Sequence, residues 1–411
     1  MKDQHKNIPK LRFPEFDEPW EEKKLNDQAT FFKGKGLSKN SLTEVGEDCI
    51  LYGELYTKYG FEINRVLSKT SELIENPIIG HKNDVLVPSS GETPIDIACA
   101  SALNVEPVIL GGDLNVIRPK NEINGTFISY QINGKYKEKL STYAQGKSVV
   151  HLYNESIKNM NIAFPSYKEQ NKISSFFSRL DKQIEFEEKK LHLLMERKKG
   201  YMQKIFSRKL RFKDEAGEDF PDWIEYKLSD ISERITRKNK GLISQLPLTI
   251  SAQYGLVDQL SFFNKSVAGV DLEGYYLLKN GEFAYNKSYS AGYPYGAIKK
   301  LDLYEEGLLS TLYICFRIKG NVNTNFLAQY FESTKWHKQI VNISGEGARN
   351  HGLLNIAVGD FFETRHILPC FEEQEKIAML LDKLDEKVKK QKKKLDLLKQ
   401  QKKGLMQLMF I

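Results

Sequence analysis

Apolar residues recur at alternating steps of four and three along two segments of the chain, residues 165–206 and 369–410. This spacing places them on one face of a helix and is typical of a coiled-coil seam. The expected seam residues are Ile173, Phe177, Leu180, Ile184, Leu191 and Leu194 in the first segment, and Ile377, Leu381, Leu384, Val388, Leu395 and Leu398 in the second.

The two segments are copies of one another, 204 positions apart and aligned without a gap. Both seams are interrupted at the same two places, by Glu187 and Gln391 and by Lys198 and Lys402. Polar seam positions reduce stability but can fix the register of a helix pair. Two unrelated surface helices would not share these interruptions. A proline heads each copy and predicts an abrupt helix start.

A shorter repeat, KLRF followed by an acidic turn, a tryptophan and Lys-Leu, begins at Lys10 and again at Lys209. The second KLRF directly follows the first helix, whereas the first KLRF has no helix before it and the other end of the chain is helical. The repeating order is helix, KLRF segment and globular region, and it closes on itself if the two ends of the chain meet. With a pseudo-two-fold axis, we expect the N-terminal segment beside the C-terminal helix and the two helices antiparallel.

The regions between these repeats are rich in short strand-like runs and turn residues. They share a framework: Lys-Asn before a strand, a later strand ending at Arg118 or Arg317, and a helix opened by Phe127 or Phe326. We expect an α+β fold, with two mixed α/β units joined by two long antiparallel coiled-coil helices in a pseudo-two-fold, cyclic arrangement. The expected domains are 1–20 (repeating 209–223), 21–164, 165–207, 208–368 and 369–411.

Composition narrows the class of protein. A hydrophobic share of 40% suits packed cores, and a net charge of +7 favours an anionic partner. No apolar run resembles a signal peptide or a membrane span. The cysteines form no metal-binding pair, and we expect reduced thiols in a cytoplasmic protein without a metal site.

Motifs for catalysis are missing from the sequence. QGKS at 145–148 lacks the earlier glycine of a phosphate-binding loop, and ENPIIG at 76–81 lacks the aromatic residue of the amino-methyltransferase signature. No glycine-rich turn for S-adenosylmethionine and no pair of nuclease carboxylates is evident. The sequence therefore indicates a binding protein with no catalytic residues and no cofactor of its own.

Basic and amide side chains in glycine-containing loops are suited to DNA, because lysine and arginine reach phosphates and amides reach base edges. A solvated loop is the alternative at each position. The lysine run at 387–394 is expected on the outer face of a helix, where charges serve solvation. The candidate DNA-binding residues are Lys33, Lys35, Lys39, Lys147, Arg234, Arg237, Lys238, Lys240, Asn286, Lys287, Tyr289, Arg349, Asn350 and His351.

The chain resembles the specificity subunit of type I restriction–modification systems. The resemblance lies in the LRFPEF…W…KL segment, the P-x-x-x-E-Q-x-K-I…L-D helix headers and the K-K-G-x-M-Q-x-x-F helix ends. It implies two target-recognition domains, each reading one half of a split double-stranded DNA sequence. It also implies spacer helices that set the gap and dock two methyltransferase subunits, and two restriction subunits that complete the enzyme. S-adenosylmethionine, ATP and Mg would bind those partner subunits, and this chain would be non-catalytic.

Helix length is compatible with this interpretation. A helix of about 35 residues spans roughly 50 Å, or about 13–15 base pairs. Two alternatives stay open: a coiled-coil scaffold with two protein-binding heads, and an enzyme of unrecognised type. Base specificity at two separate sites would distinguish the first interpretation from both.

Overall fold

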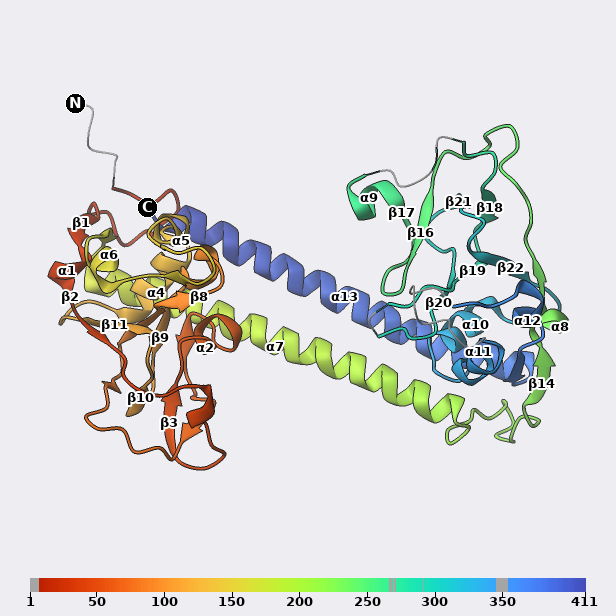
Figure 1. Ribbon diagram of the computed structural model, residues 1–411, viewed down its shortest axis with the longest axis horizontal. Coiled ribbons are helices and arrows are strands. Elements are labelled where there is room, and N and C mark those ends of the chain that lie inside the picture. Colours follow the sequence, from red (N-terminus) through yellow and green to blue (C-terminus); the bar gives the residue numbers. More distant parts are fainter. Residues whose placement is uncertain (1–6, 266–268, 270, 291, 345–353) are drawn as a thin grey trace. The chain divides into compact units, whose positions relative to one another are not determined.

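The computed structural model describes residues 7–265, 269, 271–290, 292–344 and 354–411, and it contains two compact units (Figure 1). Unit 1 combines residues 1–189 with 392–411, and unit 2 comprises residues 190–391. Two long helices, α7 (Tyr167–Phe206) and α13 (Phe371–Met409), each contribute one part to each unit.

Unit 1 contains the first thirteen strands and six shorter helices. The strands are β1 (Glu21–Lys24), β2 (Ala29–Lys33), β3 (Glu47–Ile50), β4 (Glu62–Ile63), β5 (Ser68–Thr70), β6 (Ile79–Gly80), β7 (Val85–Pro88), β8 (Ser90–Gly91), β9 (Ser101–Leu103), β10 (Val108–Leu110), β11 (Leu114–Pro119), β12 (Val150–His151) and β13 (Asn161–Phe164). The helices are α1 (Leu25–Gln28), α2 (Glu54–Thr57), α3 (Pro94–Ile97), α4 (Gly125–Asn133), α5 (Lys137–Ser141) and α6 (Asn154–Lys158), with a 3₁₀ turn, η1, at Lys39–Ser41.

The main sheet of unit 1 has the strand order β2-β11-β7-β9-β4, and a second sheet has the order β5-β3-β10-β6. β11 pairs antiparallel with both β2 and β7. The principal core joins this sheet and α4 to the ends of the long helices. Its largest buried members include Trp20, Phe127 and Phe177, and Phe410 packs against all three rings.

Unit 2 contains the remaining strands and helices. The strands are β14 (Ile224–Lys227), β15 (Ser232–Arg234), β16 (Leu248–Ser251), β17 (Gly255–Asp258), β18 (Tyr276–Lys279), β19 (Phe283–Asn286), β20 (Ala297–Lys300), β21 (Glu306–Leu309), β22 (Ile314–Ile318) and β23 (Arg365–Leu368). The helices are α8 (Leu228–Ile231), α9 (Gln259–Phe263), α10 (Thr324–Phe331), α11 (His337–Ile343) and α12 (Val358–Phe362).

Unit 2 repeats the framework of unit 1. Its sheet β15-β22-β19-β20 corresponds to β2-β11-β7-β9, and its antiparallel pair β14-β23 corresponds to β1-β13. The predicted α+β fold with long joining helices is confirmed. The attached lobes differ, because unit 1 adds the sheet of β3, β5, β6 and β10 whereas unit 2 adds the hairpin β16-β17, α9 and the pair β18-β21.

The long helices begin two residues after the prolines that were expected to start them. Helix α7 begins at Tyr167 and α13 at Phe371. The carbonyl oxygens of Pro165 and Pro369 accept hydrogen bonds from the amides of Gln170 (3.0 Å) and Gln374 (2.8 Å). The repeated Pro and Gln thus build the same turn before each helix.

Candidate DNA-recognition edges and their helix mounts

A buried ion pair holds the N-terminal segment of unit 1 against the start of α7. The guanidinium of Arg12 donates to Glu169 through Nε (2.8 Å) and Nη2 (2.7 Å), and the indole of Trp20 donates to the same carboxylate at 3.4 Å. The hydrogen bonds with Glu169 raise the pKa of Arg12. The amide nitrogen of Leu11 also donates to the carbonyl oxygen of Leu408 at 3.0 Å, so this segment touches the end of α13.

Unit 2 contains the same mount, built from the second copy of each motif. Arg211 donates to Glu373 at 2.7 Å, and the indole of Trp223 donates to it at 3.1 Å. Two sequence repeats that lie far apart along the chain therefore meet in each unit, and they fix the sheet framework to a long helix.

A second contact fixes the helix that follows β11 in unit 1 and the helix that follows β22 in unit 2. Asn124 caps α4, and its backbone nitrogen donates to Gln170 at 3.0 Å. Asn323 caps α10 and donates in the same way to Gln374 at 2.9 Å. Gln170 and Gln374 therefore each bind twice: once to the turn before their own long helix, and once to the residue that caps α4 or α10.

The predicted seam residues all lie on faces of α7 and α13 that are shielded from solvent. Each of the twelve is buried or half-buried, and Ile173, Phe177, Ile377 and Leu381 are the most enclosed. By contrast, the lysines of the run 387–394 are exposed along α13. Lys394 among them pairs with Glu187 at 2.5 Å.

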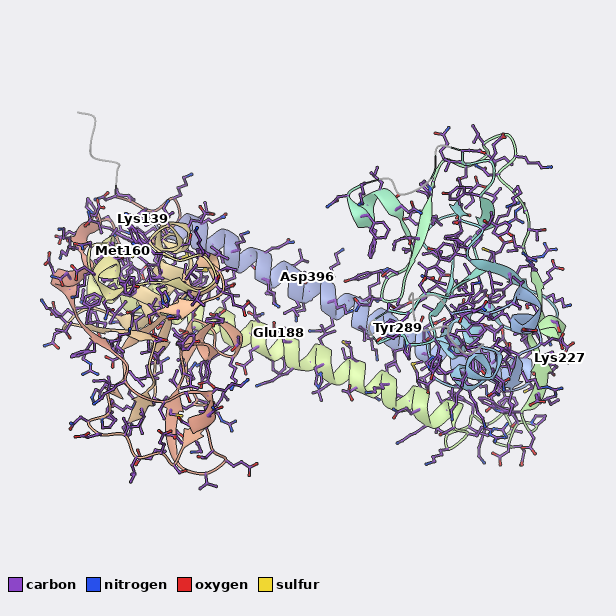
Figure 2. All side chains as sticks on the ribbon, in the orientation of Figure 1. Lys139, Met160, Glu188, Lys227, Tyr289 and Asp396 are labelled. Atoms are coloured by element: carbon purple, nitrogen blue, oxygen red, sulfur yellow. The ribbon has the colours of Figure 1, made fainter. Side chains whose placement is uncertain are left out.

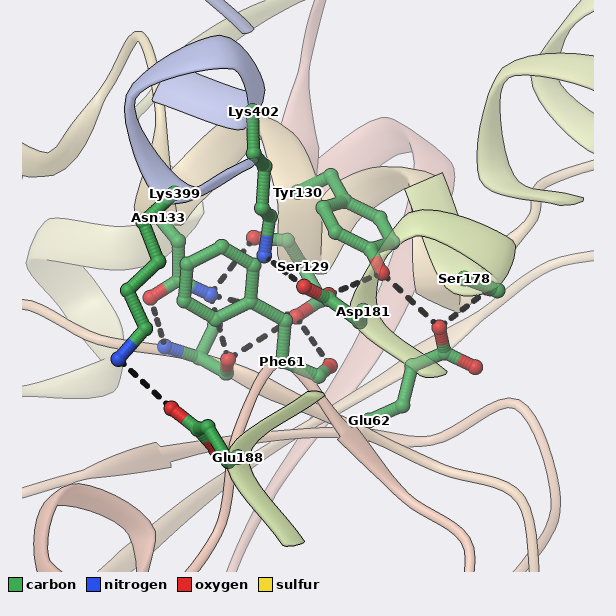
Figure 3. Close-up of polar contacts among 11 residues, drawn as sticks. Phe61, Glu62, Ser129, Tyr130, Asn133, Ser178, Asp181, Glu188, Lys399 and Lys402 are labelled. Carbon is green, nitrogen blue, oxygen red and sulfur yellow. Dashed lines mark hydrogen bonds and ion pairs between the residues drawn. The ribbon is translucent and has the colours of Figure 1, made fainter. Parts of the chain in front are cut away.

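One polar seam position carries a partly buried charge network in unit 1 (Figure 3). The ammonium of Lys402 on α13 donates to Asp181 of α7 at 2.5 Å and lies 4.0 Å from the centre of the Phe61 ring. The hydroxyl of Tyr130 donates to the same aspartate at 2.7 Å. Burial lowers the pKa of Lys402, opposed by the charge of Asp181, and burial together with that aspartate raises the pKa of Tyr130.

The equivalent position in unit 2 keeps the ion pair and changes its surroundings. Lys198 donates to Asp385 at 2.6 Å, and the amide of Gln329 on α10 donates to that aspartate at 2.8 Å. Gln329 stands where unit 1 has Tyr130, so the helices supply the same ion pair to both units, and the side chain that donates to it differs.

Two candidate DNA-binding residues of unit 1, Lys33 and Lys147, lie at one end of its main sheet. In the antiparallel register, Lys33 at the end of β2 faces Asn115, and Pro88 at the end of β7 faces Leu114. These ends therefore lie at a common edge. The loop with Lys147 reaches this edge because β12 pairs with β8, just beyond Pro88. Lys33 and Lys147 are both exposed.

The same edge in unit 2 carries different side chains. Arg234 ends β15 opposite Phe316, and Asn286 ends β19, one residue beyond the pairing of Tyr285 with Ile314. Lys287 and Tyr289 follow Asn286, and Tyr289 is 62% exposed (Figure 2). We call these two sheet ends the recognition edges of units 1 and 2.

The other candidates are placed less uniformly. Lys35 bonds the carbonyl oxygen of Glu75 at 2.7 Å, whereas Lys39 in η1 and Lys240 are exposed. Arg237 is held by Glu282 at 2.6 Å, and Lys238 lies over the ring of Tyr276 at 4.1 Å. Both are half-buried within unit 2. Arg349, Asn350 and His351 fall outside the described residues.

Sequence reasoning did not find the pairing partners that mount each unit on its helices. Arg12 and Glu169 both lie in motifs that were recognised as repeats, but they are 157 residues apart. A signal was available, because both the arginine and the glutamate recur in the second copy, at Arg211 and Glu373.

The described residues contain no group of three or more His, Cys, Asp or Glu side chains placed to hold a metal ion. No helix among them is both long and apolar enough to cross a membrane. All four cysteines are free thiols, as the sequence indicated.

Each unit is therefore a mixed α/β framework that repeated motifs attach to the long helices. Residues 17–196 match the family model of the type I restriction modification DNA specificity domain. This part of the chain is therefore similar to the DNA specificity domain of type I restriction–modification systems, in agreement with the resemblance drawn from the sequence.

A curated relative and two solved structures are similar to this chain as well. The specificity subunit of the type I restriction enzyme MjaVIII from Methanocaldococcus jannaschii is 28% identical over 233 residues, which cover 55% of this chain. The match covers 51% of that relative, so the chain spans about half the length of the curated protein that it matches.

Two solved structures share the fold across nearly the whole chain. The type I restriction–modification S subunit from M. genitalium has a TM-score of 0.60 at 17% identity, covering 98% of this chain and 99% of that one. A structure concerned with complex assembly and conformational transition of the type I R-M system has a TM-score of 0.50 at 14% identity, covering 95% and 98%. At these identities, the comparisons establish the fold.

Proposed function

We propose that this chain is the specificity subunit of a type I restriction–modification enzyme and reads a bipartite double-stranded DNA target, one half with each unit. The observation that carries this proposal is the pair of recognition edges. One framework presents Lys33 and Lys147 in unit 1, and the same framework presents Arg234, Asn286 and Lys287 in unit 2. Equal geometry with unequal side chains suits two different half-sites.

The side chains at the edges have the chemistry that DNA requires. Lysine and arginine bind phosphates and set the position of a protein on the duplex. An asparagine amide such as that of Asn286 can form two hydrogen bonds with adenine in the major groove. Tyr289 offers an exposed ring for contact with sugars or bases. Unit 2 therefore combines phosphate binding with base readout within a few consecutive residues.

The helices serve as the spacer between half-sites and as the mount for partner subunits. Two methyltransferase subunits and two restriction subunits would dock on this chain, and S-adenosylmethionine, ATP and Mg would bind to those subunits. The chain itself recognises DNA in the cytoplasm without catalysing a reaction. The repeated mounts support this role, because they give each unit the same attachment to its helices.

Co-expression with the cognate methyltransferase subunit in a methylation-free host, followed by genome-wide mapping of modified adenines, tests the proposal. We expect one split motif with a fixed gap. Exchange of residues 21–164 for those of another specificity subunit should change one half of the motif. A soluble complex that leaves the genome unmethylated would contradict the proposal and favour a coiled-coil scaffold with two protein-binding heads.

A further inference from the structure

The recognition edge of unit 1 has cations for phosphates, Lys33 and Lys147, but phosphate contacts carry no sequence information. Unit 2 has Asn286 at its edge, whose amide suits adenine. Unit 1 therefore needs a base-reading side chain of its own. Amide side chains have the right chemistry, because asparagine and glutamine each offer a donor and an acceptor to one base edge.

Amide side chains on the segments that form this edge differ in their availability. The amide nitrogen of Asn115 on β11 donates to the carbonyl oxygen of Leu152 at 2.8 Å, and Asn115 is 1% exposed. Asn154 donates to the carbonyl oxygen of Phe32 at 2.7 Å. Gln145, by contrast, is exposed, and its side chain forms no hydrogen bond with another described residue. Gln145 is thus the amide that is free to meet a ligand.

Gln145 begins a tight hairpin that closes at His151. The backbone nitrogen of each of these two residues donates to the carbonyl oxygen of the other, at 2.9 Å from Gln145 and at 2.7 Å from His151. Residues 145–149 are all exposed. Gly146 has a φ of +136°, and a Cβ there would lie 2.0 Å from the carbonyl oxygen of Val149, so only glycine permits this turn. The hairpin therefore presents Gln145 in one defined backbone conformation.

The base of the hairpin is fixed to the sheet end. Its strand β12 pairs antiparallel with β8. The hydroxyl of Ser90 and Nδ1 of His151 share a hydrogen bond of 3.1 Å. The backbone nitrogen of Leu152 donates to the carbonyl oxygen of Ser89 at 3.0 Å. A side chain on a backbone held in this way loses less freedom on binding, which favours specific contacts.

The chain returns to the recognition edge of unit 2 through the same kind of bond. There the backbone nitrogen of Leu354 donates to the carbonyl oxygen of Lys287 at 2.9 Å. Lys287 directly follows Asn286, the amide at that edge. The matching residues of unit 1 are Pro88, which has no amide, and Ser89, which is 3% exposed. Unit 1 can therefore supply an amide at this place only from another segment, and the hairpin provides one.

We propose that Gln145 is a specificity-determining residue of unit 1 and reads adenine in the major groove. Its amide oxygen accepts from adenine N6, and its amide nitrogen donates to adenine N7. Lys147, two residues further on and exposed, binds a phosphate beside that base pair. This assignment rests on the proposed function of the chain as a specificity subunit.

The test measures base preference at each motif position after co-expression with the cognate methyltransferase subunit in a methylation-free host. The relevant half-site is the one that changes when residues 21–164 are exchanged. We expect it to contain an A·T pair whose preference falls at least about tenfold in Gln145→Ala, with the other half-site and the gap unchanged. Gln145→Glu should move the preference towards cytosine, because a carboxylate accepts from cytosine N4 but cannot donate to adenine N7.

Two variants in unit 1 serve as controls. Gln28→Ala removes a half-buried amide that precedes β2, at the end of the sheet opposite to Lys33, and should leave the motif unchanged. Lys147→Ala should reduce methylation of matched and mismatched sites alike, because a phosphate contact does not distinguish bases. Binding titrations with duplexes that differ only at the assigned base pair repeat each comparison without the methylation step.

The outcomes separate this assignment from the proposed function. If the unaltered chain gives a split motif but Gln145→Ala keeps the full adenine preference, the assignment is wrong and the proposed function stands. A relevant half-site without any A·T pair would have the same meaning. A uniform loss of affinity with no relaxed base pair would make Gln145 a phosphate contact and would also overturn the assignment. Absence of a split motif from the unaltered chain would overturn the proposed function, and the assignment with it.

Discussion

The ammonium group of Lys402 lies 2.5 Å from the carboxylate of Asp181, and this contact joins the last part of α13 to the first part of α7 within unit 1. Both residues occupy positions that interrupt or border an apolar seam. An ion pair at such a place favours one register of the helices, because a shifted register leaves each charge partly buried without its partner. Lys198 and Asp385 repeat the arrangement in unit 2.

Substitution of Lys402 by Gln should therefore destabilise unit 1. Asp181 would keep its bond from Tyr130 but lose its counter-ion, and we expect a loss of about 1–3 kcal/mol in the free energy of unfolding. Urea unfolding followed by circular dichroism measures this. The control is Lys399→Gln, which breaks the exposed neighbouring pair with Glu188 and should change stability by less than about 0.5 kcal/mol. Equal effects of the two variants would contradict a special role for Lys402.

The two mounts should respond alike to loss of their buried carboxylates. Glu169→Gln and Glu373→Gln each leave an arginine with a neutral acceptor in place of a charged one, at sites where the glutamate is almost fully enclosed. We expect each change to cost about 2–4 kcal/mol. Because the sites lie in separate units, the effects should add in the double variant, as measured by chemical unfolding. A large deviation from additivity would indicate that the two mounts are coupled.

Acidification should selectively weaken unit 2. Burial lowers the pKa of His366 to about 4, from an ordinary value of 6.5. Between these pH values the unfolded chain binds a proton and the folded chain does not. His366 therefore does not lower the free energy of unfolding above pH 6.5. As pH falls from 6.5 towards 4, the free energy of unfolding decreases by about 3 kcal/mol in total. Thermal unfolding from pH 7 to pH 4 measures the decline.

A double variant that removes the buried imidazole provides the control for this pH dependence. Ile162 occupies the place of His366 in the matching strand pair. The ring of His366 shares hydrogen bonds with the hydroxyls of Tyr330 and Thr364. Thr364 keeps its bond to the carbonyl oxygen of Phe361, so His366→Ile is combined with Tyr330→Phe alone. The double variant should show a shallower loss of stability with falling pH. An unchanged slope would assign the dependence to other groups.

Lysines at the recognition edge of unit 1 should contribute to DNA binding through phosphates. Replacing Lys33 and Lys147 by Ala should lower the affinity for duplex DNA and reduce the slope of log K against log salt by about 1 for each residue. Lys390, an exposed lysine of α13, supplies the comparison, and Lys390→Ala should leave the slope unchanged. Binding titrations at several salt concentrations distinguish these outcomes. Equal slopes for all variants would remove both lysines from the interface.

An extra heptad inserted into one long helix alone should break the match between the two seams. Ion pairs such as Lys198 with Asp385 could no longer form in register on both sides of the insertion. Methylation at the original gap length should be lost when the altered chain is co-expressed with its methyltransferase. Unchanged methylation would show that the helices do not set the distance between half-sites.

The helical parts of the fold were predictable because one physical pattern determines them. Residues such as Phe177 and Leu381 recur at heptad spacing, and burial of that stripe requires a second helix. The cyclic order of the repeats then indicated an antiparallel partner. The ion pairs at the seam could not be predicted in the same way. The sequence showed Lys402 as an interruption of the apolar stripe, but its partner Asp181 is recognisable only when the two helices are placed side by side.

The recognition edges were only partly predictable. Loops with Lys33 and Asn286 stood out by composition, but their common position depends on the antiparallel register of three strands that are separated by long stretches of sequence. Composition could not distinguish Arg237, which Glu282 holds within unit 2, from Lys147, which is exposed. The strands added around the shared framework differ between the units and depend on tertiary packing. No repeat in the sequence predicts them.

The division of the chain into units has a consequence for the order of events on the ribosome. Unit 2 is continuous, whereas unit 1 needs residues 392–411, which are synthesised after all of unit 2. Phe410 completes the core around Trp20 and Phe127 only at that stage. The part of the protein that is translated first is therefore the part that completes its core last, and its exposed apolar surface must stay soluble while the second unit is being made.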